Sequence, residues 1–175
     1  MGHVVLVFTD VVRSTDMYGA LGDLMALEIV KKQFDVLFAS FSTWGRVKTI
    51  GDSVMAAFGS PSAALEAAAE SLLEINRLSN QYECTDLRIR IGIHVSPALI
   101  VPLNGINDYF GQSVNKAARI EARAEQRSCL VSREVFDSDP GAQRVYERII
   151  STDYFEEIKE QAQILKGVTE TLITK

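Results

Sequence analysis

The stretch "RVKTIGDSVMAAF", residues 46–58, decides the fold of this chain, because it places two apolar runs on either side of a Gly-Asp pair. Gly51 and Asp52 are typical of the tight turn of a β-hairpin. We therefore predict two antiparallel strands, "RVKTI" and "SVMAAF", that join at this turn. Lys48 lies at the end of the first strand, so the hairpin carries two charges beside apolar residues.

The segments before the hairpin predict one strand and one helix. The run "HVVLVF", residues 3–8, is rich in β-branched residues and predicts a buried strand. Apolar residues then recur at helical spacing from about Ser14 to Phe41, which predicts a helix. Gly19 and Gly22 are candidate breaks in its first part.

The segments after the hairpin predict helices and strands in turn. Residues 60–80 predict a helix, with Ser60 as its cap and Pro61 in its first turn. "LRIRIGIHV", residues 87–95, alternates Ile with Arg and predicts a half-buried strand. Residues 112–126 predict a further helix and "SCLVS" a strand, and the tail from about Arg144 predicts short strands with a loop.

This order of elements predicts the fold class α+β. A β-α-β-β-α-β core is the ferredoxin-like pattern, an antiparallel sheet with helices packed on one face, here followed by C-terminal strands. The 175 residues suit a single domain, 1–175, with a full core.

Composition excludes several classes of function. The net charge is −5, whereas a nonspecific nucleic-acid binder usually carries a basic excess, so we expect no nucleic-acid partner. No apolar run approaches the roughly 18 residues that span a membrane, and no signal peptide is visible, so we expect a cytoplasmic domain. Cys84 and Cys129 share no motif and predict reduced thiols in the core.

Asp10 and Asp52 are the first candidate site residues. Asp10 ends the strand in "VFTD", where an Asx turn or a helix cap is the more common explanation of a lone Asp. In the predicted order the first strand and the hairpin lie side by side, which can bring the two carboxylates together. Close carboxylates repel unless they share a proton or a cation, and two magnesium ions that span nucleotide phosphates are the usual solution.

The turn after Asp10 is a candidate phosphate site. Val12, Arg13, Ser14 and Thr15 lie where a helix begins, and backbone N–H groups at a helix start bind phosphate oxygens. Their sequence is also compatible with an ordinary turn.

The segment "NDYFGQSVNKAAR", residues 107–119, supplies a second group of candidates. Asn115 and Arg119 are four residues apart, so they share a face of the predicted helix. A solvated face explains this pair, but a planar amide and a guanidinium beside small residues also suit a sugar and a phosphate. Asp108 lies just before, at the predicted end of a loop, where a turn residue is common.

Together these motifs resemble class III nucleotidyl cyclase catalytic domains, the adenylate and guanylate cyclases. The stretches "FTDVVRST", "VKTIGDSVMAAF", "RIGIHV" and "DYFGQSVNKAARIEA" occur in the order and spacing of that family. The late "ILKGV" resembles its C-terminal signature, so the resemblance covers the chain from about Val4 to Ile173. Without this resemblance, the residues indicate only a possible site for a metal and a nucleotide.

The resemblance implies roles for the carboxylates and for the base pocket. Asp10 and Asp52 match the ligands of two divalent cations, Mg²⁺ or Mn²⁺, and the carbonyl of Val11 helps to hold one of them. Lys48 and Asp108 match the pair that recognises the base. Guanylate cyclases of this type typically carry Glu and Cys there, so the resemblance favours ATP.

The resemblance also implies catalytic residues and an assembly. Asn115 matches the residue that orients the ribose, Arg119 the residue that stabilises charge on the phosphates, and Lys166 a lysine that reaches the triphosphate. The implied enzyme is a head-to-tail homodimer with its active sites between the subunits, in which Lys48 faces the base of one site while Asp52 holds metal in the other. Such domains usually belong to longer proteins with a sensor or regulatory domain.

Some features depart from the family, and alternatives stay open. The segment "VSPALIVPLNGIN", residues 95–107, replaces a Gly-rich hairpin that helps to build the dimer, and Arg13 stands where a small residue is common. We interpret His94 as a packed structural residue. The alternatives are a guanylate or pyrimidine-nucleotide cyclase, a catalytically silent nucleotide-binding regulatory domain, and a ferredoxin-like protein-interaction module.

Overall fold

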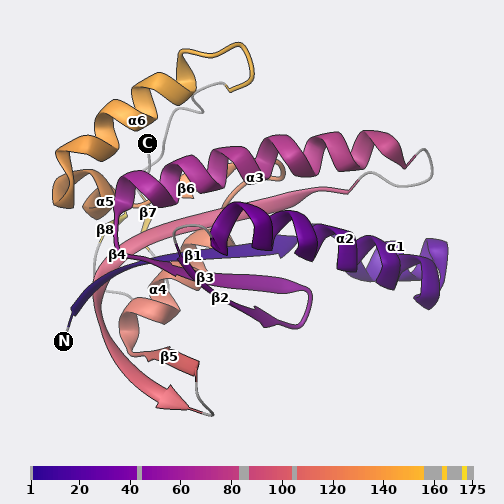
Figure 1. Ribbon diagram of the computed structural model, residues 1–175, viewed down its shortest axis with the longest axis horizontal. Coiled ribbons are helices and arrows are strands. Elements are labelled where there is room, and N and C mark those ends of the chain that lie inside the picture. The colour runs from indigo at the N-terminus through magenta and orange to yellow at the C-terminus, as the bar shows by residue number, and fades with distance from the viewer. Residues whose placement is uncertain are drawn as a thin grey trace.

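The computed structural model describes residues 2–42, 45–82, 87–103 and 106–155, and the backbone of residues 163–164 and 171–172. Its main sheet has the strand order β2-β3-β1-β4-β5, and β6 pairs with β4 (Figure 1). In chain order the elements are β1 (Gly2–Val11), α1 (Ser14–Leu21), α2 (Asp23–Ser42), β2 (Gly45–Ile50), β3 (Ser53–Phe58), α3 (Pro61–Gln81), β4 (Ile89–Leu103), β5 (Ile106–Phe110), α4 (Gln112–Glu121), β6 (Cys129–Val131), α5 (Arg133–Ser138), α6 (Pro140–Ile150), β7 (Gln163–Ile164) and β8 (Thr171–Leu172).

The predicted α+β fold with a β-α-β-β-α-β core is confirmed. Strands β2 and β3 pair in antiparallel register from Gly45 opposite Phe58 to Ile50 opposite Ser53, which closes the hairpin at the predicted turn. Gly51 has φ 65°, a conformation that favours glycine and explains this residue in the turn. The first predicted helix is broken at Gly22, with φ 75°, rather than at Gly19.

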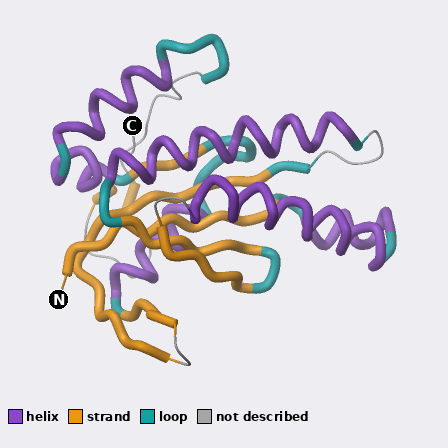
Figure 2. The backbone as a smooth tube through the Cα atoms, viewed as in Figure 1, coloured by secondary structure: helices purple, strands orange, loops and turns teal. Residues whose placement is uncertain are grey.

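The two faces of the sheet are covered by different helices (Figure 2). Val5 and Val7 of β1 face the large core that contains residues of α2 and α3, whereas Leu6 and Phe8 face a smaller cluster that includes Ala117 of α4. The prediction that the helices pack on one face is therefore wrong. Its error has a simple cause: β1 is apolar on both faces, so a layer must cover each of them.

Strand β4 is longer than predicted and carries two pairings. Its first part pairs with β1 from Ile89 to Ala98, and its outer part pairs with β5 from Leu99 to Leu103. The strand runs through two prolines because proline adopts an extended φ and keeps its carbonyl as an acceptor. Asp108 accordingly lies within β5, opposite Val101, so its predicted place at a loop end is wrong.

The segment after β6 forms two helices, and the second includes residues from Arg144 onward that were predicted to form short strands. Asp139 caps α6 by accepting a hydrogen bond from the Gly141 N–H at 2.7 Å, and Pro140 occupies the first turn. Val145 and Ile149 then pack on the core at helical spacing, so the prediction of strands from Arg144 is wrong up to Ile150. Farther on, β7 and β8 form the short strands that were expected. In the described part of the chain no helix is both long enough and apolar enough to cross a membrane.

Candidate active site

The candidate site lies on the sheet face that α4 covers. Alternate residues of a strand point to the same face, so Asp10 extends the row that includes Phe8 beyond the apolar cluster. Lys48 lies opposite Met55, a member of the same cluster, so its side chain leaves the sheet on this face too. The alternation that builds the small cluster therefore also places two charged candidates at its border.

Asp10 is held by two donors at the end of β1. Its Oδ1 accepts a hydrogen bond from Ser53 Oγ at 2.9 Å, and its Oδ2 accepts one from Arg90 Nη2 at 2.7 Å. Ser53 directly follows Asp52, so the β2–β3 turn lies beside Asp10, as predicted from the order of the strands. The backbone carbonyl of Asp52 accepts a hydrogen bond from Gln33 Nε2 at 3.4 Å, which ties the turn to α2.

Arg90 joins the end of β1 to the end of α4. Its Nε donates to Glu121 Oε1 at 2.6 Å, and its Nη1 donates to the carbonyl of Ala122 at 3.3 Å. Burial alone would lower the pKa of Arg90, but the carboxylates of Glu121 and Asp10 raise it above its ordinary value. Burial raises the pKa of Glu121. The guanidinium thus neutralises two carboxylates at the border of the cluster.

The carboxylates suit a hard divalent cation. Mg²⁺ and Mn²⁺ prefer oxygen ligands, and Asp10 and Asp52 supply such ligands from one end of the sheet. Among the described residues, no group of three or more His, Cys, Asp or Glu side chains is placed to hold a metal. Asp10 and Asp52 could hold a cation that takes its other ligands from phosphate oxygens and water, which is typical of Mg²⁺ bound together with a nucleotide.

Lys48 and Asp108 come together although 60 residues separate them in the sequence. Lys48 Nζ of β2 forms an ion pair and a hydrogen bond with Asp108 Oδ1 of β5, and both side chains keep nearly a third of their surface exposed. The N–H of Tyr109 donates to the same oxygen at 2.8 Å. The hydrogen bond from Lys48, followed by that from Tyr109, lowers the pKa of Asp108. In the part of the chain that the structure describes, no hydrogen bond reaches Asp108 Oδ2.

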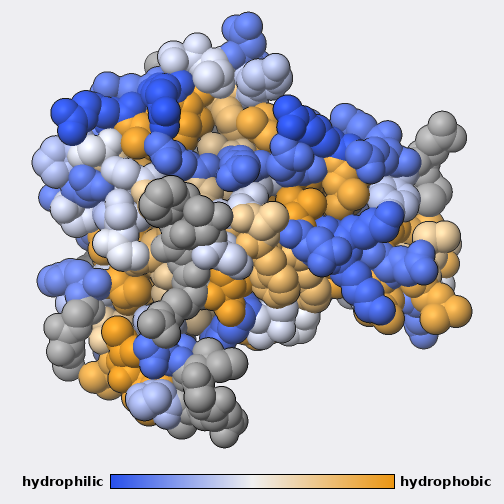
Figure 3. Space-filling view, viewed as in Figure 1, coloured by the Kyte–Doolittle hydropathy of each residue, from blue (hydrophilic) through white to orange (hydrophobic). Residues whose placement is uncertain are grey.

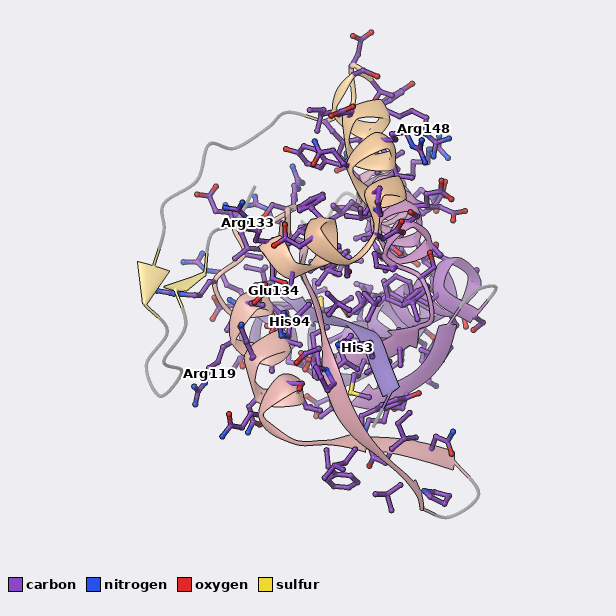
Figure 4. The ribbon with its side chains drawn as sticks, turned by 90° about the vertical axis from the view of Figure 1, so that its left-hand side faces the viewer. His3, His94, Arg119, Arg133, Glu134 and Arg148 are labelled. Carbon is purple, nitrogen blue, oxygen red and sulfur yellow. The ribbon has the colours of Figure 1, made fainter. Side chains whose placement is uncertain are left out.

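Asn115 and Arg119 lie on α4, as predicted. Asn115 is exposed and Arg119 is half-buried, while Ala117 between them is fully buried against the sheet. Figure 4 shows Arg119 pointing away from the body of the molecule. Neither side chain has a hydrogen bond or ion pair with the described residues, so both present polar groups that a ligand could engage.

The turn after β1 offers fewer N–H groups than the sequence suggested. The Val12 N–H already donates to the carbonyl of Arg88 at 2.9 Å, so Val12 is engaged in the sheet. The N–H groups of Ser14 and Thr15 begin α1, where the first N–H groups of a helix have no partner within it. Arg13 precedes them with φ 58°, and its side chain is 82% exposed and lies 3.7 Å from Asp16.

The comparison with known families covers most of the chain. The adenylate and guanylate cyclase catalytic domain matches residues 1–158. This chain belongs to that family.

The relatives of this cyclase domain include both kinds of enzyme. Receptor-type adenylate cyclase GRESAG 4.3 of Trypanosoma brucei brucei is 30% identical over 182 residues, which cover 82% of this chain and 15% of that protein. Soluble guanylate cyclase gcy-31 of Caenorhabditis elegans is 28% identical over 157 residues, which cover 79% of this chain and 22% of that protein. The cyclase domain therefore spans less than a quarter of either relative.

Solved structures of cyclases have the same fold. An adenylate cyclase from Trypanosoma brucei in its monomeric state matches with a TM-score of 0.79 at 25% identity, covering 99% of this chain and 88% of that one. Adenylyl cyclase CyaB from P. aeruginosa matches with a TM-score of 0.77 at 18% identity, covering 98% and 91%. Both adenylate and guanylate cyclases occur among the relatives of this cyclase domain.

Sequence reasoning missed Arg90 and Glu121 at the site. Arg90 was placed on the outer face of its strand without a partner, because the register that sets it opposite Asp10 is not visible in a local pattern. The alternation of "LRIRIGI" did contain a signal, since it put Arg90 on the face opposite the buried Ile residues. Lys166, predicted to reach the triphosphate, lies outside the described residues.

Proposed function

We propose that this cyclase domain converts ATP to 3′,5′-cyclic AMP and pyrophosphate. The observation that carries the proposal is the pairing of Lys48 with Asp108, which two distant strands bring to the α4 face of the sheet. The two residues form one donor and acceptor unit on a partly exposed surface. Adenine requires such a unit, because its edge presents an amino donor beside a ring-nitrogen acceptor.

The hydrogen bonds of Asp108 favour adenine over guanine. Oδ1 is occupied by Lys48 and by the Tyr109 N–H, which leaves Oδ2 to accept from the exocyclic amino group of adenine. Lys48 has further N–H donors for the adjacent ring nitrogen. Guanine has a carbonyl at this position, which would face the carboxylate. A site built to hydrogen-bond one base discriminates against an analogue that leaves its polar groups unpaired.

The remaining candidates act on the phosphates and the ribose. Asp10 and Asp52, with the carbonyl of Val11, would hold two divalent cations, which lower the pKa of the ribose 3′-hydroxyl and neutralise phosphate charge when bound. Asn115 would orient the ribose so that its 3′-oxygen is in line with the α-phosphorus. Arg119, together with Lys166, would stabilise the charge that develops as pyrophosphate leaves.

We infer that the active sites form between two copies of the domain arranged head to tail. The β4–β5 hairpin supports this inference, because its apolar side chains are exposed at the lower edge of the molecule (Figure 3). Leu99, Ile100 and Phe110 are between 42% and 48% exposed, and Val101 is 39% exposed. Contiguous exposed apolar residues usually mark an interaction surface. Residues 95–103 would thus supply a contact strand where relatives have a Gly-rich hairpin.

A turnover assay tests the proposal. The purified domain is incubated separately with ATP, GTP, CTP and UTP in the presence of Mg²⁺ or Mn²⁺, over a range of protein concentrations. We expect cyclic AMP to be the main product, and we expect the specific activity to rise with concentration as dimers form. A different cyclic product would overturn the base assignment, and no product at any concentration would favour a nucleotide-binding regulatory domain.

The base pocket is tested by Lys48→Met, which removes the charge and keeps an unbranched side chain. We expect the kcat/KM for ATP to fall about ten- to hundredfold, because a hydrogen bond to a charged group contributes about 1.5–3 kcal/mol. Arg148→Met is the matched control, since Arg148 pairs with Glu66 on the opposite side of the sheet. Unchanged ATP turnover in Lys48→Met would contradict the assignment of this residue.

A further inference from the structure

A buried polar network lies on the inner side of α4. Lys116 is only 6% exposed, and its Nζ donates to Glu134 Oε1 of α5 at 2.7 Å. The other carboxylate oxygen, Oε2, lies 3.9 Å from Nδ1 of His94, and the same ring nitrogen is 2.8 Å from Ser132 Oγ. His94 on β4 is therefore a packed structural residue, as predicted, and the network links three elements (Figure 4).

The network is not a second catalytic centre. Ser132 and Glu134 both approach Nδ1 of His94, whereas a hydrolytic triad needs the nucleophile on one ring nitrogen and the acid on the other. Ser132 is also fully buried and thus closed to a substrate. Burial would raise the pKa of Glu134, but the hydrogen bond from Lys116 leads the contacts that lower it below its ordinary value. The pair of Lys116 and Glu134 is therefore an ion pair.

The position of Lys116 in the sequence connects this network to the site. Successive residues of a helix point about 100° apart, so the direction of Lys116 fixes the directions of Asn115, one residue before it, and Arg119, three residues after it. Ile120 and the pair of Arg90 with Glu121 hold the C-terminal end of α4. Between Asn115 and Arg119 the only buried apolar side chain is Ala117, and the hydrophobic effect is non-directional, so Lys116 supplies the directional contact nearest to these two residues. A short hydrogen bond between charged groups is directional.

We propose that Lys116 is a positioning residue whose ion pair with Glu134 sets the rotation of α4 at which Asn115 and Arg119 meet the nucleotide. A lysine is rarely buried without a partner, and here its partner belongs to the next helix rather than to α4 itself. The expected effect on turnover rests on the proposed function. The expected rotation of α4 is independent of that function, because it can be observed without turnover.

The test compares Lys116→Met with Lys116→Arg. Methionine fills the same space without the charge, whereas arginine keeps the charge. In Lys116→Met we expect kcat to fall about ten- to hundredfold with KM changed less than about threefold, because a misplacement of about 1 Å in a catalytic group costs up to about a hundredfold. We expect Lys116→Arg to recover most of the loss. Arg133→Met is the matched control, because Arg133 is the neighbour of Glu134 on α5 but forms an exposed ion pair with Asp137.

A second readout does not depend on activity. The side-chain amide of Asn115 and the Nε–H of Arg119 give separate signals in a ¹⁵N–¹H NMR spectrum of the folded protein. We expect Lys116→Met to shift both signals and Arg133→Met to leave both in place. Should Lys116→Met not fold, Glu134→Gln carries a milder form of the test, because it removes the charge of the pair but keeps an acceptor for Lys116, so we expect smaller shifts of the same two signals.

The outcomes separate the positioning role from the cyclase function. If the wild type forms no cyclic nucleotide, the proposed function is overturned. If Lys116→Met nevertheless shifts both signals, the role of Lys116 in setting the rotation of α4 is supported. Unshifted signals, or an unchanged kcat in folded Lys116→Met beside an active wild type, would overturn the positioning role and leave the cyclase function standing. A fall in stability with kcat intact would show that the network is only structural.

Discussion

The two faces of the sheet differ in what they contain. The face toward α2 and α3 is closed by a large apolar core, in which Leu37, Phe41 and Ile91 are fully buried. The face toward α4 has a small apolar cluster bordered by the charges of Asp10 and Lys48. The same strands serve both faces through the alternation of their side chains. The large apolar core and the candidate site are therefore separated by the thickness of one sheet.

Among substitutions on the face toward α4, that of Asp10 is expected to give the largest loss of turnover. Asp10→Asn keeps an oxygen for Ser53 but removes the charge that a cation requires, so we expect turnover to fall about a thousandfold or more, because bound metal supplies several kcal/mol of transition-state stabilisation. The thermal unfolding temperature should fall only modestly, because Arg90 loses its ion pair with Asp10 but keeps the one with Glu121. Asp137→Asn on exposed α5 serves as the control. Normal turnover in Asp10→Asn would remove this residue from the proposed mechanism.

Substitution of Ile91 should give the converse result on the core face. Ile91 is 0% exposed, and its change to Ala deletes buried methyl groups and leaves a cavity, which typically lowers the free energy of unfolding by about 2–5 kcal/mol. Urea denaturation measures this loss, and Ile91→Val should cost about 0.5–1.5 kcal/mol as a graded control. The kcat of the folded fraction, measured at low temperature, should stay the same. A large loss of kcat would show that the two faces are coupled.

Gly92, the next residue of β4, is expected to break the separation. A Cβ at Gly92 would lie 2.3 Å from the backbone N of Glu121 and 2.5 Å from its Cα, so α4 must shift to admit it. Overpacking of this kind costs about 1–3 kcal/mol of stability, and we expect kcat to fall as well because α4 carries Asn115 and Arg119. Gly59→Ala is the control, since no atom lies within 4 Å of its added Cβ.

Gly92→Ala and Ile91→Ala therefore form a matched pair on opposite faces of one strand. The ratio of lost kcat to lost stability should be large for Gly92→Ala and near zero for Ile91→Ala. Equal ratios at the two positions would mean that the loss of activity follows from unfolding alone, and the separation of the faces would not hold.

Local patterns predicted the elements that alternation and turn chemistry define. The hairpin around Gly51 and the capped start of α3 at Ser60 were predicted correctly, because each depends on a few adjacent residues. The two candidate carboxylates were predicted to meet because strand order alone puts the end of β1 beside the hairpin turn. The roles of these residues stay predictions.

What the sequence did not predict depends on contacts between distant segments. Arg90 and Asp10 meet only because β4 pairs with β1 in one particular register. Residues 144–150 carry several β-branched and aromatic side chains and were predicted to form strand, yet the cap at Asp139 and the contacts of Val145 and Ile149 make them helical. Tertiary packing overrides weak local preference in such segments.

The smallest predicted effect concerns helix caps on the core side. Asp139 accepts hydrogen bonds from Gly141 N and from Ser62 Oγ, both at 2.7 Å, and so joins the start of α6 to the start of α3. We expect Asp139→Ala to lower the free energy of unfolding by about 1 kcal/mol at pH 7, which is typical of a lost cap. Ser60→Ala, at the cap of α3, should cost a similar amount and provides an uncharged comparison.

The two caps should differ in their dependence on pH. The hydrogen bond from Ser62, followed by that from Gly141, lowers the pKa of Asp139, so the folded state favours the carboxylate. Its contribution is complete above the ordinary carboxyl pKa of about 3.9 and is lost as pH falls through the lowered value. Urea unfolding from pH 7 downward should therefore show a shrinking difference between wild type and Asp139→Ala, but a constant one for Ser60→Ala. A constant difference for both would mean that Asp139 acts by its geometry and not by its charge.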